Sequence, residues 1–248
     1  MLDTDKISVQ LYTVREALAA DLDGTLARLA AIGFTQVEPF GLTDSATTLA
    51  PALAAHGLRA PSTHAKVVGG DVPAALAAAA LTGTTFVIEP HVDPARWTTE
   101  DDVAAIATEL NEAAGLAADA GVTIGYHNHQ FELATLIGGR PALEVLADHL
   151  SDAVALEVDT YWAFVGGVDV PDLLGRLGSR VRAVHLKDGD GTMETKNQVG
   201  LGAGALDVDA ILAASSGVQL GVIELDDTSG DVFEAVATGY RYLTGARA

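Results

Sequence analysis

The stretch GVTIGYHNHQ, residues 121–130, begins as an apolar strand and ends in polar side chains. Seven other stretches have the same form, and each leads into an amphipathic helical run. The predicted strands cover residues 7–13, 36–40, 59–66, 85–92, 122–130, 154–162, 181–189 and 221–227. Eight strand–helix units in 248 residues fit a closed barrel, so the sequence predicts an α/β fold with a single (β/α)₈ TIM barrel domain over residues 1–248. The alternative is an open doubly wound sheet, which usually has a glycine-rich phosphate loop after its first strand, and QLYTVREAL has no glycine.

The composition excludes several classes of function. With 49% hydrophobic residues and a net charge of -20, the chain is expected to be a folded globule that repels nucleic acid. No apolar run is long enough to span a bilayer, and the first ten residues lack the apolar core of a signal peptide, so a cytoplasmic location is expected. The absence of cysteine excludes disulfides and thiolate chemistry. Assembly into a homo-oligomer stays open.

Pairs of side chains two residues apart, polar at every position except Phe40, occur at the carboxyl end of every predicted strand. The pairs are Gln10 and Tyr12, Glu38 and Phe40, His64 and Lys66, Glu89 and His91, His127 and His129, Glu157 and Asp159, His185 and Lys187, and Glu224 and Asp226. Residues two apart in a strand share a face, and charged groups facing the helices would be buried without partners. A lone polar residue at a strand end is usually a loop-edge residue. Eight such pairs instead predict a polar site inside the barrel at its carboxyl-terminal mouth.

Four residues from four consecutive predicted strands form a candidate metal site. They are His127, Asp159, His185 and Glu224. Two imidazoles and two carboxylates suit one divalent cation, with Mn²⁺ favoured, Co²⁺, Zn²⁺ and Fe²⁺ as alternatives, and Mg²⁺ less well suited. The chain has no His-x-x-x-His or Cys-x-x-Cys spacing, so this prediction depends on the predicted barrel. Glu157 lies deeper in its strand than Asp159 and is predicted to be a partner of a ligating histidine.

Several motifs together resemble one known family. GVTIGYHNHQFEL, LEVDTYWAFVGGVD, VHLKDGD, VGLGAGALD, VIELDD and the opening SVQLYTVRE are similar, in order, to the sugar phosphate isomerase/epimerase family of xylose isomerase-like TIM barrels. The resemblance implies a divalent metal held by Glu, Asp, His and Glu on strands 5 to 8. Asp159, His185 and Glu224 match that pattern directly. The chain departs from it at His127, where the family usually has glutamate.

The resemblance also implies a chemistry, in which a proton is removed beside a carbonyl and a metal-stabilised enediolate forms. Glu224 would then be ligand and base, His129 a second acid or base, and Lys187 a holder of a substrate oxygen. The remaining strand-end residues predicted to contact a sugar or polyol substrate are Gln10, Glu38, His64 and Glu89, together with Trp162, which either stacks on the sugar or anchors a loop. The GLGAGALD stretch is interpreted as a flexible mouth loop.

The reaction itself has more than one candidate. In the family's epimerases the strand-5 glutamate is also an acid/base group, and this chain has His127 in its place. Isomerisation or epimerisation is therefore the first prediction, and dehydratase or lyase chemistry is the second. The residues are also compatible with a non-catalytic sugar-binding barrel, or with a barrel whose histidines only satisfy backbone groups. An endonuclease-like activity is disfavoured because the sequence has no basic groove. The absence of an arginine cluster also disfavours a phosphorylated substrate.

Overall fold

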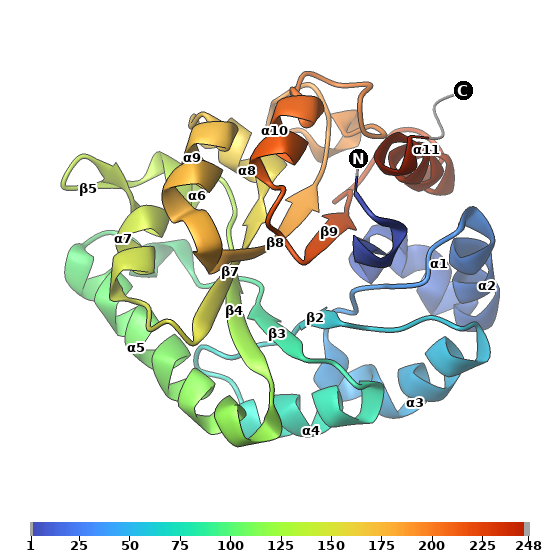
Figure 1. The fold of residues 1–248 in the computed structure, drawn as a ribbon, viewed down its shortest axis with the longest axis horizontal. Coiled ribbons are helices and arrows are strands. Elements are labelled where there is room, and N and C mark those ends of the chain that lie inside the picture. The colour runs from blue at the N-terminus through green and yellow to red at the C-terminus, as the bar shows by residue number, and fades with distance from the viewer. Residues whose placement is uncertain (1, 246–248) are drawn as a thin grey trace.

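The computed structural model describes residues 2–245 and shows a curled parallel sheet surrounded by helices (Figure 1). Within these residues seven strands pair in the order β1-β9-β8-β7-β4-β3-β2. The strands are β1 (Ile7–Val9), β2 (Ser62–His64), β3 (Phe86–Glu89), β4 (Thr123–His127), β7 (Val154–Asp159), β8 (Val181–Leu186) and β9 (Leu220–Ile223). Two short strands, β5 (Leu136–Ile137) and β6 (Arg140–Pro141), form a separate antiparallel pair.

Residues 36–40 take the eighth position and close the barrel between β1 and β2. Isolated parallel bridges join Gln10 to Glu38 on one side and Phe40 to His64 on the other. The amide of Leu11 donates to the Glu38 carbonyl at 2.8 Å. This segment is not a regular strand because Pro39 has no N–H to give to a ladder. The predicted (β/α)₈ barrel is confirmed, with its second strand reduced to these bridges.

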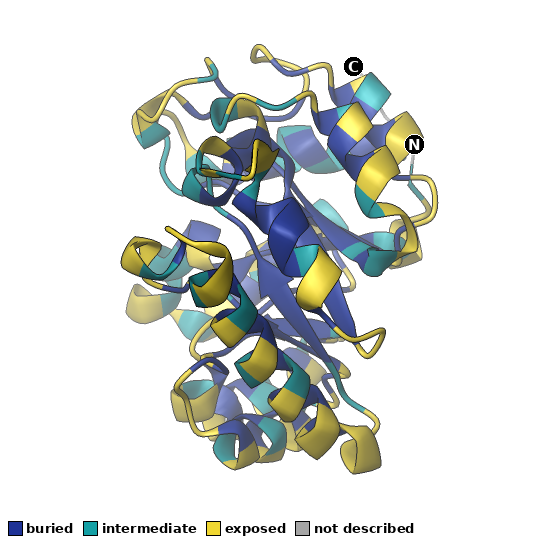
Figure 2. Ribbon diagram, turned by 90° about the vertical axis from the view of Figure 1, so that its left-hand side faces the viewer, coloured by how far each residue is buried: buried dark blue, intermediate teal, exposed yellow. Residues whose placement is uncertain are grey.

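Helices cover the outer face of the sheet, and the strands are buried beneath them (Figure 2). They are α1 (Arg15–Ala20), α2 (Leu22–Ile32), α3 (Leu42–Ala55), α4 (Val72–Thr82), α5 (Glu100–Ala117), α6 (Phe131–Ala134), α7 (Ala142–His149), α8 (Thr160–Val165), α9 (Val170–Leu177), α10 (Val208–Ala214) and α11 (Val232–Thr244). Aspartate side chains such as Asp71 and Asp169 accept backbone N–H bonds at their first turns, as N-caps do.

The barrel interior changes from apolar to polar along the strands. An inner cluster of buried apolar residues fills the lower part, and its members are Phe86, Ile88, Ala155, Ala183, Leu220 and Val222. Two residues further along three of these strands the inward side chains are Glu157, His185 and Glu224, because alternate residues share a face. The polar layer at the mouth therefore lies directly above a layer of buried apolar side chains.

The strands end earlier than the sequence predicts. β4 ends at His127, β8 at Leu186 and β9 at Ile223, whereas the predicted strands continue to residues 130, 189 and 227. The chain has to leave the sheet at the mouth to enter the next helix, so the last polar residues of these three predicted strands lie in βα loops. His129 and Lys187 are consequently loop residues at the mouth.

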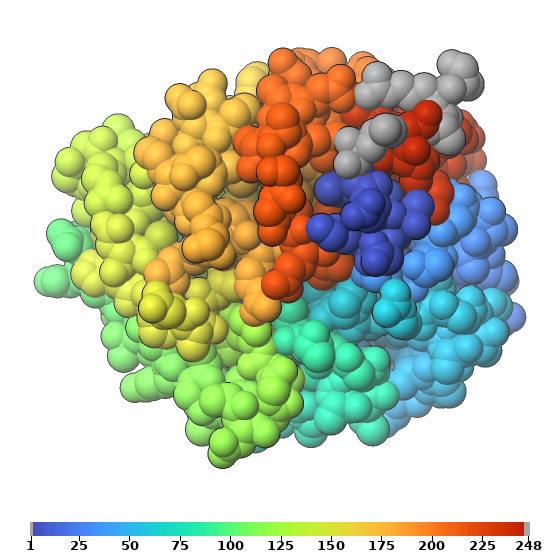
Figure 3. Space-filling model, in the orientation of Figure 1, coloured from blue at the N-terminus to red at the C-terminus, as the bar shows by residue number. Residues whose placement is uncertain are grey.

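The two ends of the described chain lie side by side. Leu2 N donates to the Leu243 carbonyl of α11 at 3.2 Å, and in Figure 3 the dark blue N-terminal segment contacts the red C-terminal one. Among the described residues, no helix combines the length and the apolar character that crossing a membrane requires.

A glycine in β4 tests the packing of the apolar layer. A Cβ at Gly125 would lie 2.5 Å from the Phe86 ring, whereas a Cβ at Gly115 on α5 would have no neighbour within 4 Å. We expect Gly125→Ala to lower the free energy of unfolding by about 1–3 kcal/mol through overpacking. Gly115→Ala, the matched control, should raise it by about 0.4–1 kcal/mol. Urea unfolding measures both, and a Gly125→Ala protein as stable as the wild type would contradict the packing.

Candidate metal centre

A pocket of about 460 Å³ opens at the carboxyl ends of the strands, where barrel active sites lie. Its lining includes His127, Lys187 and Glu224, and also the partly exposed aromatic side chains of Tyr12 and Phe40. The pocket therefore combines charged groups with an aromatic edge.

The ligand set predicted from the sequence is assembled at this pocket. We call His127, Asp159, His185 and Glu224 the mouth set; their facing nitrogen and oxygen atoms all lie within 4.8 Å of one another. His185 Nδ1 is 2.6 Å from Glu224 Oε2, and His127 Nε2 is 3.7 Å from Asp159 Oδ2. None of the four residues is more than 5% exposed. Two imidazoles and two carboxylates at this spacing fit one divalent cation.

The two carboxylate oxygens of Asp159 have different contacts. Its Oδ1 caps α8 by accepting the Trp162 N–H at 2.9 Å. Its Oδ2 is buried and has no hydrogen-bond partner among the described residues, although the Lys187 ammonium lies 2.9 Å away. The contact between Lys187 Nζ and Asp159 Oδ2 is as short as a hydrogen bond, but its angles are not those of a hydrogen bond. Oδ2 is thus a buried oxygen with coordination capacity to spare, as a metal ligand needs.

Lys187 neutralises the carboxylates of the mouth. Its Nζ lies 2.9 Å from Asp159 Oδ2, 2.8 Å from Glu224 Oε2 and 2.9 Å from Asp226 Oδ2. Burial by itself lowers the pKa of Lys187, but these three carboxylates outweigh burial and raise the pKa well above its usual value. Burial by itself raises the pKa of Glu224, but the positive charges of Lys187 and His185 outweigh burial and hold this pKa well below its usual value. Both groups are therefore charged at neutral pH.

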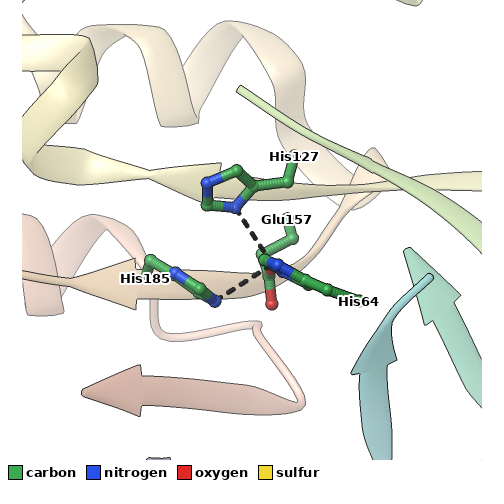
Figure 4. Close-up of side chains that lie close together, drawn as sticks. All are labelled: His64, His127, Glu157 and His185. Carbon is green, nitrogen blue, oxygen red and sulfur yellow. Dashed lines mark hydrogen bonds and ion pairs between the residues drawn. The ribbon is translucent and has the colours of Figure 1, made fainter. Parts of the chain in front are cut away.

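A second cluster lies directly beneath the mouth set and shares two of its histidines. We call His64, His127, Glu157 and His185 the deep set (Figure 4). Glu157 Oε2 lies 2.7 Å from His64 Nε2, 3.1 Å from His127 Nδ1 and 3.1 Å from His185 Nε2. Glu157 therefore contacts both shared histidines, whereas the sequence predicted that it is the partner of one ligating histidine.

The two shared imidazoles differ in charge. Burial favours the neutral form of each, but His185 also faces the carboxylates of Glu157, Glu224 and Glu38, which raise its pKa well above the usual value. Burial and then the charge on His185 lower the pKa of His127 well below the usual value. His127 is therefore a neutral imidazole with a lone pair available for a metal.

His129 lies on the pocket wall and is also neutral. Burial, followed by the nearby charge of Lys187, lowers the pKa of its imidazole to about 4. Its Nδ1 is buried and has no hydrogen-bond partner among residues 2–245. A neutral imidazole on the pocket wall can donate to, or accept from, a substrate hydroxyl. The predicted acid or base role of His129 stays a prediction.

The residues predicted to contact substrate divide into two groups. His64 lies on the pocket wall. Gln10 and Glu38 are fully buried behind it, where Gln10 Nε2 donates to Glu38 Oε1 at 2.9 Å and Ser62 Oγ donates to Glu38 Oε2. Trp162 is 4% exposed, and its ring centroid is 5.5 Å from Lys187 Nζ. The contacts of Gln10, Glu38 and Trp162 are those of groups that position the wall.

Glu89 faces away from the pocket. The inward residues of β3 are Phe86 and Ile88, so Glu89 has the opposite parity. Its Oε2 accepts the amides of Val67 and Val68 at 2.6 and 2.7 Å. It holds the loop after β2, and it does not share the inward face on which its prediction as a substrate contact depended.

Five pocket residues from the strand-end pairs had no assigned contact in the sequence interpretation: Tyr12, Phe40, Lys66, His91 and Asp226. Tyr12 and Phe40 pack edge to face, with ring centroids 5.3 Å apart, and Asp226 pairs with Lys187. All five are outer members of the strand-end pairs. The two-residue period therefore pointed to them, but no sequence signal separates an outer residue that lines the pocket from one that only borders it.

The glycine-rich loop after β8 is tied to a buried carboxylate. Asp188 Oδ2 accepts the amides of Gly202 and Gly204 at 2.9 Å each, and Oδ1 accepts the Leu206 amide at 3.2 Å. A Cβ at Gly204 would overlap Asp188 Oδ1, so glycine permits this close approach. Asp188 therefore accepts three hydrogen bonds from the loop backbone, and the flexibility of this loop stays a prediction.

Comparison with known proteins identifies a family. The family described as xylose isomerase-like TIM barrel matches residues 26–214. No curated protein matches the chain in sequence.

Three solved structures illustrate the likeness in fold. A sugar phosphate isomerase/epimerase from Parabacteroides distasonis superposes with a TM-score of 0.85 at 23% identity, over 99% of this chain and 95% of that one. The probable 3-DHS dehydratase AsbF, involved in petrobactin synthesis in Bacillus anthracis, gives 0.76 at 13% identity, over 96% and 98%. The IOLI protein with a bound zinc atom gives 0.71 at 16% identity, over 97% and 98%. At these identities the likeness establishes the fold alone.

Glu132 should make stability depend on pH. Its carboxylate accepts the Tyr126 hydroxyl at 2.7 Å and the His129 amide at 2.8 Å, yet burial dominates and raises its pKa from 4.5 to about 7. A raised carboxyl pKa means that the folded state holds the proton more tightly. Protonated Glu132 therefore stabilises the folded state at pH values below the pKa that Glu132 has in the unfolded chain. This contribution to the free energy of unfolding, on the order of 3 kcal/mol, is lost as the pH rises through the pKa of Glu132 in the folded protein.

Glu132→Gln removes this titration while keeping the side chain's shape. Between pH 4.5 and 7 the wild type should therefore lose stability relative to the variant, as measured by urea unfolding at several pH values. Other titrating groups act on both proteins and cancel in the difference. Parallel pH profiles for the two proteins would show that Glu132 is ionised in the folded state throughout.

Proposed function

Because the chain belongs to the xylose isomerase-like TIM barrel family, we propose that it is a divalent-metal-dependent sugar isomerase or epimerase acting on a keto-sugar or polyol. One observation carries the proposal: the mouth set places two imidazoles and two carboxylates within 4.8 Å of one another, beside a pocket of about 460 Å³. A polar cluster at the carboxyl-terminal mouth of a barrel is where catalysis takes place in this architecture.

The mouth set would hold one divalent ion, with Mn²⁺ favoured. His127 Nε2, Asp159 Oδ2, His185 Nδ1 and a Glu224 oxygen would be its ligands. Asp159 Oδ2, which accepts no hydrogen bond from the described residues, and the neutral His127 ring support that assignment. When bound, such an ion supplies Lewis-acid stabilisation of an enediolate. The mixed nitrogen and oxygen set also accepts Co²⁺, Zn²⁺ or Fe²⁺, and the related IOLI protein has a bound zinc atom.

Glu224 would move the proton. Its carboxylate is ionised at neutral pH and lies on the pocket wall, so it can take a proton from the carbon beside a substrate carbonyl and return it. The Lys187 ammonium, 2.8 Å from Glu224 Oε2, is placed to stabilise the negative charge that develops on a substrate oxygen. His129 would bind a substrate hydroxyl from the pocket wall. The apolar layer below excludes water from the floor of the site.

The substrate is proposed to be neutral. The pocket wall carries Glu224 and Asp226, and Lys187 is already shared among three carboxylates. No arginine lines the pocket within the described part of the chain. Apart from Lys66, which also lines the pocket, a phosphate group would meet little uncompensated positive charge. A polyol can donate hydroxyl hydrogens to the carboxylates. A small sugar or polyol, rather than nucleic acid, is the proposed partner.

Dehydration is the second candidate, and His127 favours it. A symmetrical epimerisation needs two bases on opposite sides of the reacting carbon, and a neutral His127 of low pKa replaces one of the glutamates usual in this family. Elimination of a β-hydroxyl needs only one base, Glu224, and one acid. The related AsbF protein is a probable dehydratase. Analysis of products formed in deuterated water separates the two, because epimerisation returns a deuteron to carbon and dehydration releases hydroxide as water.

The ligand assignment predicts a loss of metal and activity together. Asp159→Ala and Glu224→Ala should each lower metal content and turnover of keto-sugars by about 100-fold or more, with the fold retained by circular dichroism. Asp152→Ala is the matched control, because its side chain is fully exposed and distant from the mouth, and it should change neither quantity. Retained activity in either mouth-set variant would remove that residue from the ligand set.

Metal analysis distinguishes an enzyme from a sugar-binding barrel. Protein purified without chelator should contain close to one divalent ion per chain. Less than about 0.2 ion per chain would count against the metal site. Full metal loading combined with sugar binding but no turnover of any keto-sugar would instead support the non-catalytic barrel.

A further inference from the structure

His127 and His185 each present one ring nitrogen to the mouth set and the other to the deep set. His127 Nε2 faces Asp159 at 3.7 Å, while its Nδ1 faces Glu157 at 3.1 Å. His185 Nδ1 faces Glu224 at 2.6 Å, while its Nε2 faces Glu157 at 3.1 Å. We propose that the deep set is a second metal position, selective for zinc, and that an ion held there excludes an ion from the mouth set.

The deep set has the composition of a zinc site. Its facing atoms are His64 Nε2, His127 Nδ1, Glu157 Oε2 and His185 Nε2, all within 4.8 Å of one another. In Figure 4 the three imidazoles surround the Glu157 carboxylate, and they come from three different strands. Three imidazole nitrogens and one carboxylate match the tetrahedral nitrogen-rich coordination that Zn²⁺ prefers.

The surroundings support the deep set as a built site. Glu38 Oε1 lies 2.7 Å from His185 Nε2 and 3.3 Å from His64 Nε2, and Gln10 and Ser62 hold Glu38 in place. Glu157 Oε1 is buried and has no hydrogen-bond partner in the described part of the chain. His64 also lines the pocket, so an ion entering from solvent reaches the deep set past this ring. The site therefore has ligands, supporting carboxylates and a route of entry.

The shared imidazoles make the two positions exclusive. A neutral imidazole has one nitrogen with a free lone pair, and its other nitrogen carries a hydrogen. Binding of an ion at either position displaces one proton from the His185 ring to solvent. With an ion in the mouth set, His127 Nδ1 keeps its hydrogen and donates it to Glu157, and His185 Nε2 keeps its hydrogen and donates it to Glu38. With an ion in the deep set, the same hydrogens move to His127 Nε2 and His185 Nδ1, which then donate toward Asp159 and Glu224. Filling both positions would require both rings to be imidazolates.

The different donor atoms assign different metals to the two positions. The mouth set offers two oxygens and two nitrogens, together with an open pocket for substrate oxygens, and this suits Mn²⁺. The deep set offers three nitrogens and one oxygen with little room for further ligands. With zinc in the deep set, the nitrogens of His127 and His185 that face the mouth would carry hydrogens and have no lone pair for a metal. Zinc would therefore displace Mn²⁺ although the two ions use different ligand atoms. This inference concerns metal binding, so it does not depend on which sugar reaction takes place.

The test is the metal affinity of two variants, each of which alters one position. Chelator-treated protein is titrated separately with Zn²⁺ and Mn²⁺ by calorimetry. His64→Gln should weaken Zn²⁺ binding by about tenfold or more while leaving Mn²⁺ affinity within about threefold. Glu224→Gln should do the reverse. His56→Gln, a histidine paired with Asp23 on the surface, is the control and should change neither affinity.

Other outcomes overturn the proposal. If His64→Gln leaves Zn²⁺ affinity unchanged, or if both variants weaken both metals equally, the deep set is not a separate position. Two ions bound at once per chain, measured by native mass spectrometry, would contradict exclusion. Anomalous diffraction at the zinc edge gives a check that does not depend on any variant: the ion should lie about 2.0–2.1 Å from His64 Nε2. Failure of Mn²⁺ to bind would count against the proposed function and leave the zinc result to stand alone.

Discussion

The structure depends on the contact between the Glu157 carboxylate and three imidazoles inside the barrel. Removing a carboxylate from water costs several kcal/mol, and it is tolerated only where partners satisfy it. Glu157 Oε2 has such partners at 2.7 to 3.1 Å in His64, His127 and His185. These partners hold Glu157 ionised, with a pKa well below its usual value in spite of the burial that opposes it. The same contacts fix the direction in which His127 and His185 present their other nitrogens to the mouth.

Above this layer the charges are arranged in alternation. Lys187 compensates Asp159, Glu224 and Asp226, and His185 compensates Glu38, Glu157 and Glu224. The carboxylates therefore stay close together without an external cation, and they can also accept one. An apolar layer below and helices outside keep the local dielectric low, which strengthens each of these interactions. The barrel thus maintains a polar site at its mouth because its lower interior is dry and packed.

Much of this arrangement was predictable from residue order. The alternation of strands and helices predicts the barrel, and the two-residue period of polar side chains at strand ends predicts that His127, Asp159, His185 and Glu224 meet. The positions of Gln10, Glu38 and Glu89 relative to the pocket were not predictable. Glu89 follows the inward Ile88 directly in β3. Successive residues of a strand point to opposite faces, so the Glu89 side chain lies on the other face of the sheet. Gln10 and Glu38 have the right parity but are covered by His64, because a bulky ring from a neighbouring strand end lies above them. The strand over residues 36–40 was predicted as regular, whereas Pro39 reduces it to isolated bridges.

The central claim is that the mouth set binds a divalent ion in a position open to the pocket. A crystal structure of the protein with Mn²⁺, phased by the anomalous signal of manganese, tests this claim most directly. The account predicts one strong peak within bonding distance of His127 Nε2, Asp159 Oδ2, His185 Nδ1 and a Glu224 oxygen, with Lys187 still paired to Asp226. A map with no peak at the mouth, or with manganese only on surface carboxylates, would contradict it.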